Sequence, residues 1–299
     1  MAFFKKKKKT LQQDLSGPAE QQGMVFLVHL LMEEKCILPD KDVMDNIMRK
    51  YLGNVECFSY DETMAGFAAN EYTTCFEKED SNVPAQLLIT ECTEIKKPIM
   101  DEISYSQTWD CPESDEILKS CRYHVVATDL LAAGLHYKDR AEMLVKYVEA
   151  LVEMFPTCEA VVFETSKKML PRETIINCDL PIESRFIYYA VNVRFFNIQD
   201  SDDMLVDSLG MSTLFMPDLQ YHFHSMDPNF VVNHAYNVLS YLYDAENPLK
   251  SGDRIDGIKE GEMSMDVQWK VQYENALIQP VREVIDFNMG EYAAGTRQQ

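Results

Sequence analysis

The feature that most constrains the fold is one long amphipathic helix set between two short apolar runs. From residue 139 to 155, apolar residues recur every three or four positions along one stripe, with charged residues opposite. Pro156 ends this pattern because proline cannot continue a helix. The flanking runs, 123–130 and 158–164, have the length and composition of buried strands. This order predicts a crossover connection between the two strands. If the strands are neighbours in the sheet, they are parallel and the connection is right-handed.

Similar units of strand and helix are expected on both sides of this one. Asp40 and Gly53 bound an earlier amphipathic helix, and Asp227-Pro228 begins a later one with a capping residue and a first-turn proline. We therefore expect an α+β fold, with mixed or antiparallel sheets and helices packed on one face, built from repeated strand–helix–strand units. The other strand-like segments are 24–31, 55–60, 67–77, 85–91, 186–198, 211–216, 219–224, 263–273 and 281–289.

The expected domain boundary is the charged, proline-containing segment 171–184, which has the composition of a surface connection. The sequence thus predicts a basic tail at 1–23, an N-terminal α+β domain at 24–180, a C-terminal α+β domain at 185–289 and a second tail at 290–299. The first tail contains Phe3-Phe4 followed by the lysines from Lys5 to Lys9. We expect a solvated end here, or else a weak contact with an anionic membrane surface.

The charge balance limits the possible partners. The formal net charge is −21 even though five lysines stand together in the tail, so the remaining chain is more acidic still. Such a body repels phosphate backbones, which argues against nucleic-acid binding, and attracts basic proteins or cations. No apolar run is long enough to span a bilayer. The eight cysteines include no Cys-x-x-Cys pair and no secretion signal is evident, so we expect free thiols in a cytoplasmic protein.

Two histidines are the first candidate site. In a strand, His222 and His224 share one face with Gln220, and two imidazoles at that spacing bind zinc if a third ligand converges. A nearby carboxylate such as Asp218 is available for that role. His234 lies on the apolar row of the following helix, where we expect a core histidine bonded to a backbone carbonyl.

Other candidates are weaker. Ser166 follows the second crossover strand, at the kind of strand end where ligands gather, but no Gly-x-Ser-x-Gly motif surrounds it. The aspartates 200, 202, 203 and 207 lack the EF-hand pattern, so we interpret them as a solvated loop. No Gly-x-Gly-x-x-Gly or Gly-x-x-x-x-Gly-Lys motif occurs, and we expect no cofactor.

Several motifs carry a family resemblance. They are Gly210-Met211, the run Phe215-Met216-Pro217-Asp218-Leu219, Asn237 and Tyr241 in the later helix, and the turn Gly252-Asp253. With them, the segment from Gly210 to Met289 resembles the bacterial domain-of-unknown-function family 4261. The region around Trp109, Cys121-Arg122-Tyr123-His124 and Phe163-Glu164-Thr165-Ser166 is similar to what such proteins carry upstream.

The resemblance implies no established activity. Asp218 and Asp253 are polar positions in these motifs and are candidate ligand-binding residues, together with Ser166. Arg254 departs from the small hydroxylated residue expected after Gly252-Asp253.

Two functions remain open from the sequence. The favoured one is a non-catalytic protein-interaction protein of bacterial conflict or immunity type, whose acidic surface binds a basic partner. The alternative is a metal-assisted hydrolase that uses His222, His224 and a carboxylate. The presence of bound metal in purified protein separates the two.

Overall fold

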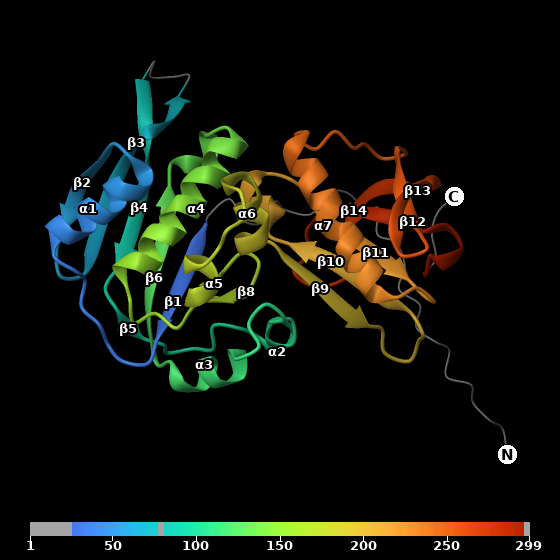
Figure 1. Ribbon diagram of the computed structural model, residues 1–299, viewed down its shortest axis with the longest axis horizontal. Coiled ribbons are helices and arrows are strands. Elements are labelled where there is room, and N and C mark those ends of the chain that lie inside the picture. The colour runs from blue at the N-terminus through green and yellow to red at the C-terminus, as the bar shows by residue number, and fades with distance from the viewer. Residues whose placement is uncertain (1–25, 77–80, 296–299) are drawn as a thin grey trace. The chain divides into compact units, whose positions relative to one another are not determined.

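The computed structural model describes residues 26–76 and 81–295. The described residues form two compact units, 26–192 and 193–295 (Figure 1). The boundary follows Asn192 and does not fall at 171–184, because that segment contains α5 (Arg172–Ile176) and the start of α6 (Ile182–Ala190), both of which pack on α4 (Tyr137–Met154). The basic tail at 1–23 lies outside the described residues.

The N-terminal unit is built on one antiparallel sheet. Its strand order is β2-β3-β4-β6-β1-β7-β8, and the short β5 also pairs with β6. The first strand, β1, therefore lies between β6 and β7, and the helix that connects those two strands joins strands that are not neighbours. The strands are β1 (Leu27–Met32), β2 (Val55–Tyr60), β3 (Met64–Phe76), β4 (Ser81–Thr90), β5 (Thr93–Glu94), β6 (Tyr123–Leu130), β7 (Ala160–Phe163) and β8 (Lys168–Pro171).

The two long helices of this unit are α1 (Lys41–Leu52) and α4, which pack together. A buried ion pair between Arg140 of α4 and Asp129 of β6 identifies the face of the sheet that α4 covers. Because side chains alternate along strands, the neighbours of Asp129 point to the other face, and so do His29 and Leu31 of β1. The short helices α2 (Glu102–Tyr105) and α3 (Ser114–Ser120) lie against that other face.

The C-terminal unit has a six-stranded mixed sheet of order β12-β13-β14-β11-β10-β9, in which β11 and β14 are parallel. The helix α7 (Pro228–Asp244) packs on one face, and Asp227 caps it by accepting a hydrogen bond from the Asn229 N–H. The strands are β9 (Asn192–Asn197), β10 (Met204–Leu209), β11 (Asp218–Phe223), β12 (Arg254–Lys259), β13 (Glu262–Asn275) and β14 (Glu283–Asn288).

The predicted α+β class, with mixed and antiparallel sheets, is confirmed. Two strand predictions were wrong: residues 186–190 belong to α6, and Met211–Leu214 is a 3₁₀ helix. Both are short apolar runs, for which periodicity alone does not separate strand from helix. The first part of the predicted C-terminal tail is packed, since the Ala294 N–H donates to the His222 carbonyl.

All eight cysteines are free, as expected. No helix in the described ranges combines the length and apolar character that crossing a membrane requires.

Candidate functional site

The segment 95–121 crosses the face of the first sheet that α4 leaves open. Leu31, Val162 and Met169 point from three strands toward this segment and form a hydrophobic cluster with its Met100 and Cys121. Burial of these side chains is the main force that holds the segment on the sheet. The partly buried apolar side chains that complete the cluster are Ile95, Ile99, Ile117 and Leu118.

Three polar contacts also attach this segment. The Lys168 ammonium is almost fully buried and lies 3.0 Å from a carboxylate oxygen of Asp110. Burial lowers the pKa of Lys168, although Asp110 opposes that shift. Asn192 donates to the Gln107 carbonyl at 3.4 Å, and Lys167 donates to the Ile99 carbonyl at 3.4 Å. The segment is thus fixed by Lys168 at the start of β8, by Lys167 just before it and by Asn192.

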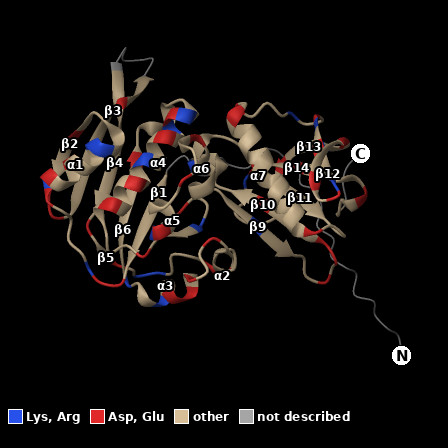
Figure 2. Ribbon diagram, in the orientation of Figure 1, with Lys and Arg blue, Asp and Glu red and all other residues tan. Residues whose placement is uncertain are grey.

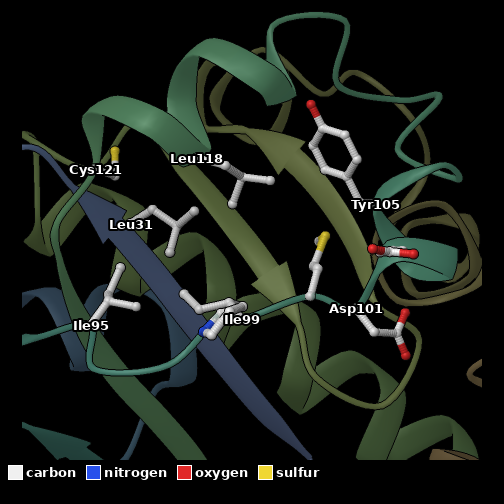
Figure 3. A pocket seen from close by; sticks show the side chains of 10 residues that line it. Leu31, Ile95, Ile99, Asp101, Tyr105, Leu118 and Cys121 are labelled. Atoms are coloured by element: carbon white, nitrogen blue, oxygen red, sulfur yellow. The ribbon is translucent and has the colours of Figure 1, made fainter.

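An apolar pocket of about 270 Å³ remains between the segment and the sheet (Figure 3). Leu31 lies at its base, and Ile99 and Leu118 face it from the segment. Asp101 and Tyr105 stand on the other side of the pocket, at the two ends of α2. An opening lined by carbon, with a carboxylate beside it, suits an apolar side chain that is followed by a positive charge.

The thiol in this pocket is not a nucleophile at neutral pH. Burial raises the pKa of Cys121 to about 11 and that of the neighbouring Cys111 also to about 11. A thiol with such a pKa stays protonated, and the protonated form is unreactive. The pocket therefore offers shape and apolar surface to a ligand, without a reactive sulfur.

The surface around the pocket is acidic and carries exposed apolar side chains. Figure 2 shows acidic positions along α3 and on the chain around it. Ile103, Tyr105 and Trp109 are 44%, 39% and 59% exposed, which is unusual for large apolar residues so close together. Residues 95–121 contain three basic residues, Lys96, Lys97 and Lys119. The acidic residues of the same stretch are Asp101, Glu102, Asp110, Glu113, Asp115 and Glu116.

A row of titratable side chains occupies the same face of the sheet beside the pocket. The His29 and His124 rings are stacked, with their Nδ1 atoms 3.0 Å apart, and His29 Nε2 lies 3.1 Å from Glu164. Lys167 pairs with the same carboxylate. Burial lowers the pKa of His124, and the nearby His29 lowers it further. Burial works to raise the pKa of Glu164, but the hydrogen bonds from His29 and Lys167 outweigh it and lower that pKa.

This row was missed from the sequence. The one available signal was His29, a polar residue within the apolar run of β1. Its partner on β6 is about a hundred positions away in sequence, and the pairing of β1 with β6 brings the two together.

The predicted zinc candidates lie in the C-terminal unit. His222 is buried, and its Nε2 lies 3.5 Å from Asp203, while His224 follows the end of β11 and contacts Ser225 at 3.0 Å. His234 is a core histidine, as expected, and its Nε2 bonds to the Asp256 carbonyl at 2.7 Å. Across the described residues, no three His, Cys, Asp or Glu side chains are grouped so as to hold a metal ion.

The other predicted residues have structural contacts. Ser166 is fully buried, and its hydroxyl accepts a hydrogen bond from the Lys168 backbone N–H at 3.2 Å. Asp253 is exposed and accepts the Lys250 N–H at 2.8 Å, which closes the turn before β12. Asp218 is buried and accepts hydrogen bonds from Ser208 and from the Met211 N–H. The structure does not bring these three residues together at one described pocket.

Asp218 belongs to a buried ionic network on the face of the second sheet opposite α7. Arg194 makes two bonds to Asp207, at 2.8 and 2.6 Å, and Arg282 bridges Asp207 to Asp218. Burial raises the pKa of Asp218 in spite of Arg282. The interpretation of Asp207 as part of a solvated loop was therefore wrong. The acidic run before it extends into β10, where two arginines that are distant in sequence neutralise Asp207.

Most of this network lies in a segment that matches a known protein family. Residues 207–288 match DUF4261, a domain of unknown function. The DUF4261 segment runs from within β10 to the end of β14 and contains Asp207, Asp218 and Arg282, with Arg194 just before it. The network thus lies almost entirely within the matched segment. Comparison with curated proteins and with solved structures finds no match.

A hollow of the C-terminal unit is lined mostly by the DUF4261 segment and partly by residues 289–292. This hollow has a volume of about 530 Å³ and lies between the start of α7 and the hairpin of β12 and β13. Phe230 and Trp269 line it, and so do both Lys259 and Glu260. Its charged lining residues are Asp227, Glu260, Glu291 and Lys259, whereas the apolar pocket of the N-terminal unit is lined by Asp101 and Glu102 and by no basic residue. The latter is the stronger candidate for a binding site with a definable partner.

Proposed function

We propose that this protein is a non-catalytic interaction protein that binds a basic partner through the surface formed by residues 95–121. The observation that carries the proposal is the apolar pocket of about 270 Å³ beside exposed aromatic side chains, in a segment with six carboxylates and three lysines. In the following we call this surface the acidic pocket face. The partner that fits it is a protein segment in which an apolar side chain is flanked by lysines or arginines.

The two components of the face contribute differently to binding. Burial of one leucine or phenylalanine side chain in the pocket is worth about 1.5–3 kcal/mol. Exposed carboxylates at the rim mainly raise the association rate and make it sensitive to salt, because their charge is screened over roughly 10 Å at 0.1 M salt. The pocket therefore selects for an apolar anchor, and the rim selects for positive charge around it.

The test uses a fluorescent synthetic peptide in which two adjacent leucines are flanked on both sides by two arginines. Its binding to the full chain is measured by fluorescence anisotropy at low salt. The variant Glu102→Lys, Glu113→Lys, Glu116→Lys reverses three exposed charges of the acidic pocket face. We expect this variant to bind the peptide about tenfold more weakly or worse, since three local attractions become repulsions.

Two controls separate the site from the general field of an acidic protein. The variant Glu56→Lys, Glu62→Lys, Glu260→Lys changes the net charge equally at exposed positions elsewhere, and it should keep most of the affinity. A peptide with serines in place of leucines should bind about tenfold more weakly, since its apolar anchor is gone. Equal weakening by both triple variants, or no binding of the leucine peptide, contradicts the proposal.

A further inference from the structure

The chain itself contains a segment with the chemistry that the acidic pocket face fits. Phe3 and Phe4 are adjacent apolar side chains, and the five residues from Lys5 to Lys9 follow them directly. The pocket offers Leu31, Ile99 and Leu118 to an apolar side chain. An apolar pair followed by consecutive cations therefore complements a pocket of this lining beneath a surface rich in carboxylates.

The segment is long enough to reach the pocket of its own chain. The described chain begins at Phe26, directly before β1, and Leu31 lines the pocket only five positions further on. At the rise of an extended strand, that separation is about 17 Å. A flexible coil with as many residues as separate Phe4 from Phe26 has a root-mean-square span of about 26 Å. The two lengths are similar, and this is the condition under which an intramolecular ligand reaches a high effective concentration.

We propose that the N-terminal segment from Phe3 to Lys9 binds the acidic pocket face of its own chain and competes with the external partner. This inference rests on the proposed function, because it assigns a second ligand to the same site. A tethered ligand at millimolar effective concentration lowers the apparent affinity for any competitor. A partner must then either bind more tightly than the segment or be present at high concentration.

The first test removes the anchor without changing the charge. The full-length variant Phe3→Ser, Phe4→Ser and the native chain are titrated against the leucine peptide described above. We expect the variant to bind the peptide about fivefold more tightly or better, because the pocket is freed. The matched control Gln12→Ser, Gln13→Ser changes two polar positions just beyond the segment and should leave the affinity as it is in the native chain.

The second test locates the segment directly. A carbodiimide joins a lysine amine to a carboxylate without a spacer, and mass spectrometry then identifies the linked residues. We expect links from the lysines 5–9 to Glu102, Glu113 or Glu116. An equal mixture of ¹⁴N- and ¹⁵N-labelled chains separates links within one chain from links between two copies.

The outcomes keep the two proposals apart. If both chains bind the peptide with equal affinity, the inference is overturned and the proposed function stands. If neither chain binds the peptide, the proposed function fails and the cross-links alone test the inference. The inference that the segment binds its own chain is overturned if all links join two copies. It is also overturned if all links go to carboxylates outside residues 101–120.

Discussion

At the scale of single residues, the two faces of the first sheet carry different kinds of ionisable pair. On the α4 face, Arg140 and Asp129 are buried together, with 2.8 Å between the guanidinium and the carboxylate. On the opposite face, His29 and His124 stack at a partly buried position beside the acidic pocket face. Burial raises the pKa of Asp129 although Arg140 opposes that shift, whereas burial lowers the pKa of His124 and the neighbouring His29 lowers it further.

The histidine pair predicts a loss of stability in mild acid. Burial, and next the neighbouring His29, lower the pKa of His124 below 6.5, and burial also lowers the pKa of His234. Between those lowered values and about 6.5, the unfolded chain binds more protons than the folded one. The free energy of unfolding should therefore fall as the pH drops from about 6.5 through this window. Glu164 contributes only at lower pH, because its pKa is shifted below 4.5.

The measurement is urea unfolding at a series of pH values from 5 to 7. The variant His124→Gln should show a smaller pH slope than the native chain. His136→Gln, at an exposed position that leaves the stacked pair intact, is the matched control. An unchanged slope in His124→Gln would rule out this assignment.

At the scale of elements, the ion pair between Asp110 and Lys168 attaches the connection between α2 and α3 to β8. Removal of the carboxylate leaves a buried ammonium beside the Val191 carbonyl, at 3.1 Å, and the Tyr188 ring. We expect Asp110→Ala to lower the free energy of unfolding by about 2 kcal/mol, less than for a fully buried pair because Asp110 is partly exposed. Asp115→Ala, at an exposed pair with Lys119, should change it little.

The double variant Asp110→Ala, Lys168→Met checks the physical reason. It removes the unpaired charge and keeps most of the side-chain volume, so it should recover part of the lost stability. Urea midpoints at pH 7 give the comparison. If the double variant is less stable than Asp110→Ala alone, desolvation of Lys168 is not the cause.

The sequence predicts elements whose signal is local. The apolar stripe of α4 was sufficient to predict that helix, the largely apolar run of β6 to predict that strand, and Asp227-Pro228 to predict the start of α7. By contrast, the strand β12 was missed, because its residues are exposed or only partly buried over much of its length and its pattern is weak. Short apolar runs such as Met211–Leu214 were assigned wrongly because they fit both the spacing of apolar residues in a helix and that in a buried strand.

The candidate site depended on contacts that no local pattern encodes. Leu31 meets Leu118 because β1 is inserted between β6 and β7, and nothing in the sequence around either residue predicts that order. The same holds for Arg282, which joins Asp207 across most of the DUF4261 segment. Composition did predict an acidic chain, but only the fold brings the carboxylates of α3 beside an apolar pocket.

At the scale of the whole molecule, the two units hold different features. The N-terminal unit holds the acidic pocket face, with its apolar opening and exposed aromatic residues. The C-terminal unit holds the DUF4261 match, a buried ionic network and a hollow of mixed charge. The proposed binding of a basic partner is therefore local to residues 95–121, whatever the net charge of the chain contributes at longer range.

Hydrogen–deuterium exchange of the full chain, with and without saturating leucine peptide, tests this claim most directly. We predict that the peptide slows exchange of backbone amides in residues 95–121 and in the adjoining end of β1, and leaves the strands β12 and β13 unchanged. Protection that appears at the hollow near Trp269 instead, or that is absent from residues 95–121 when binding is complete, would contradict the account.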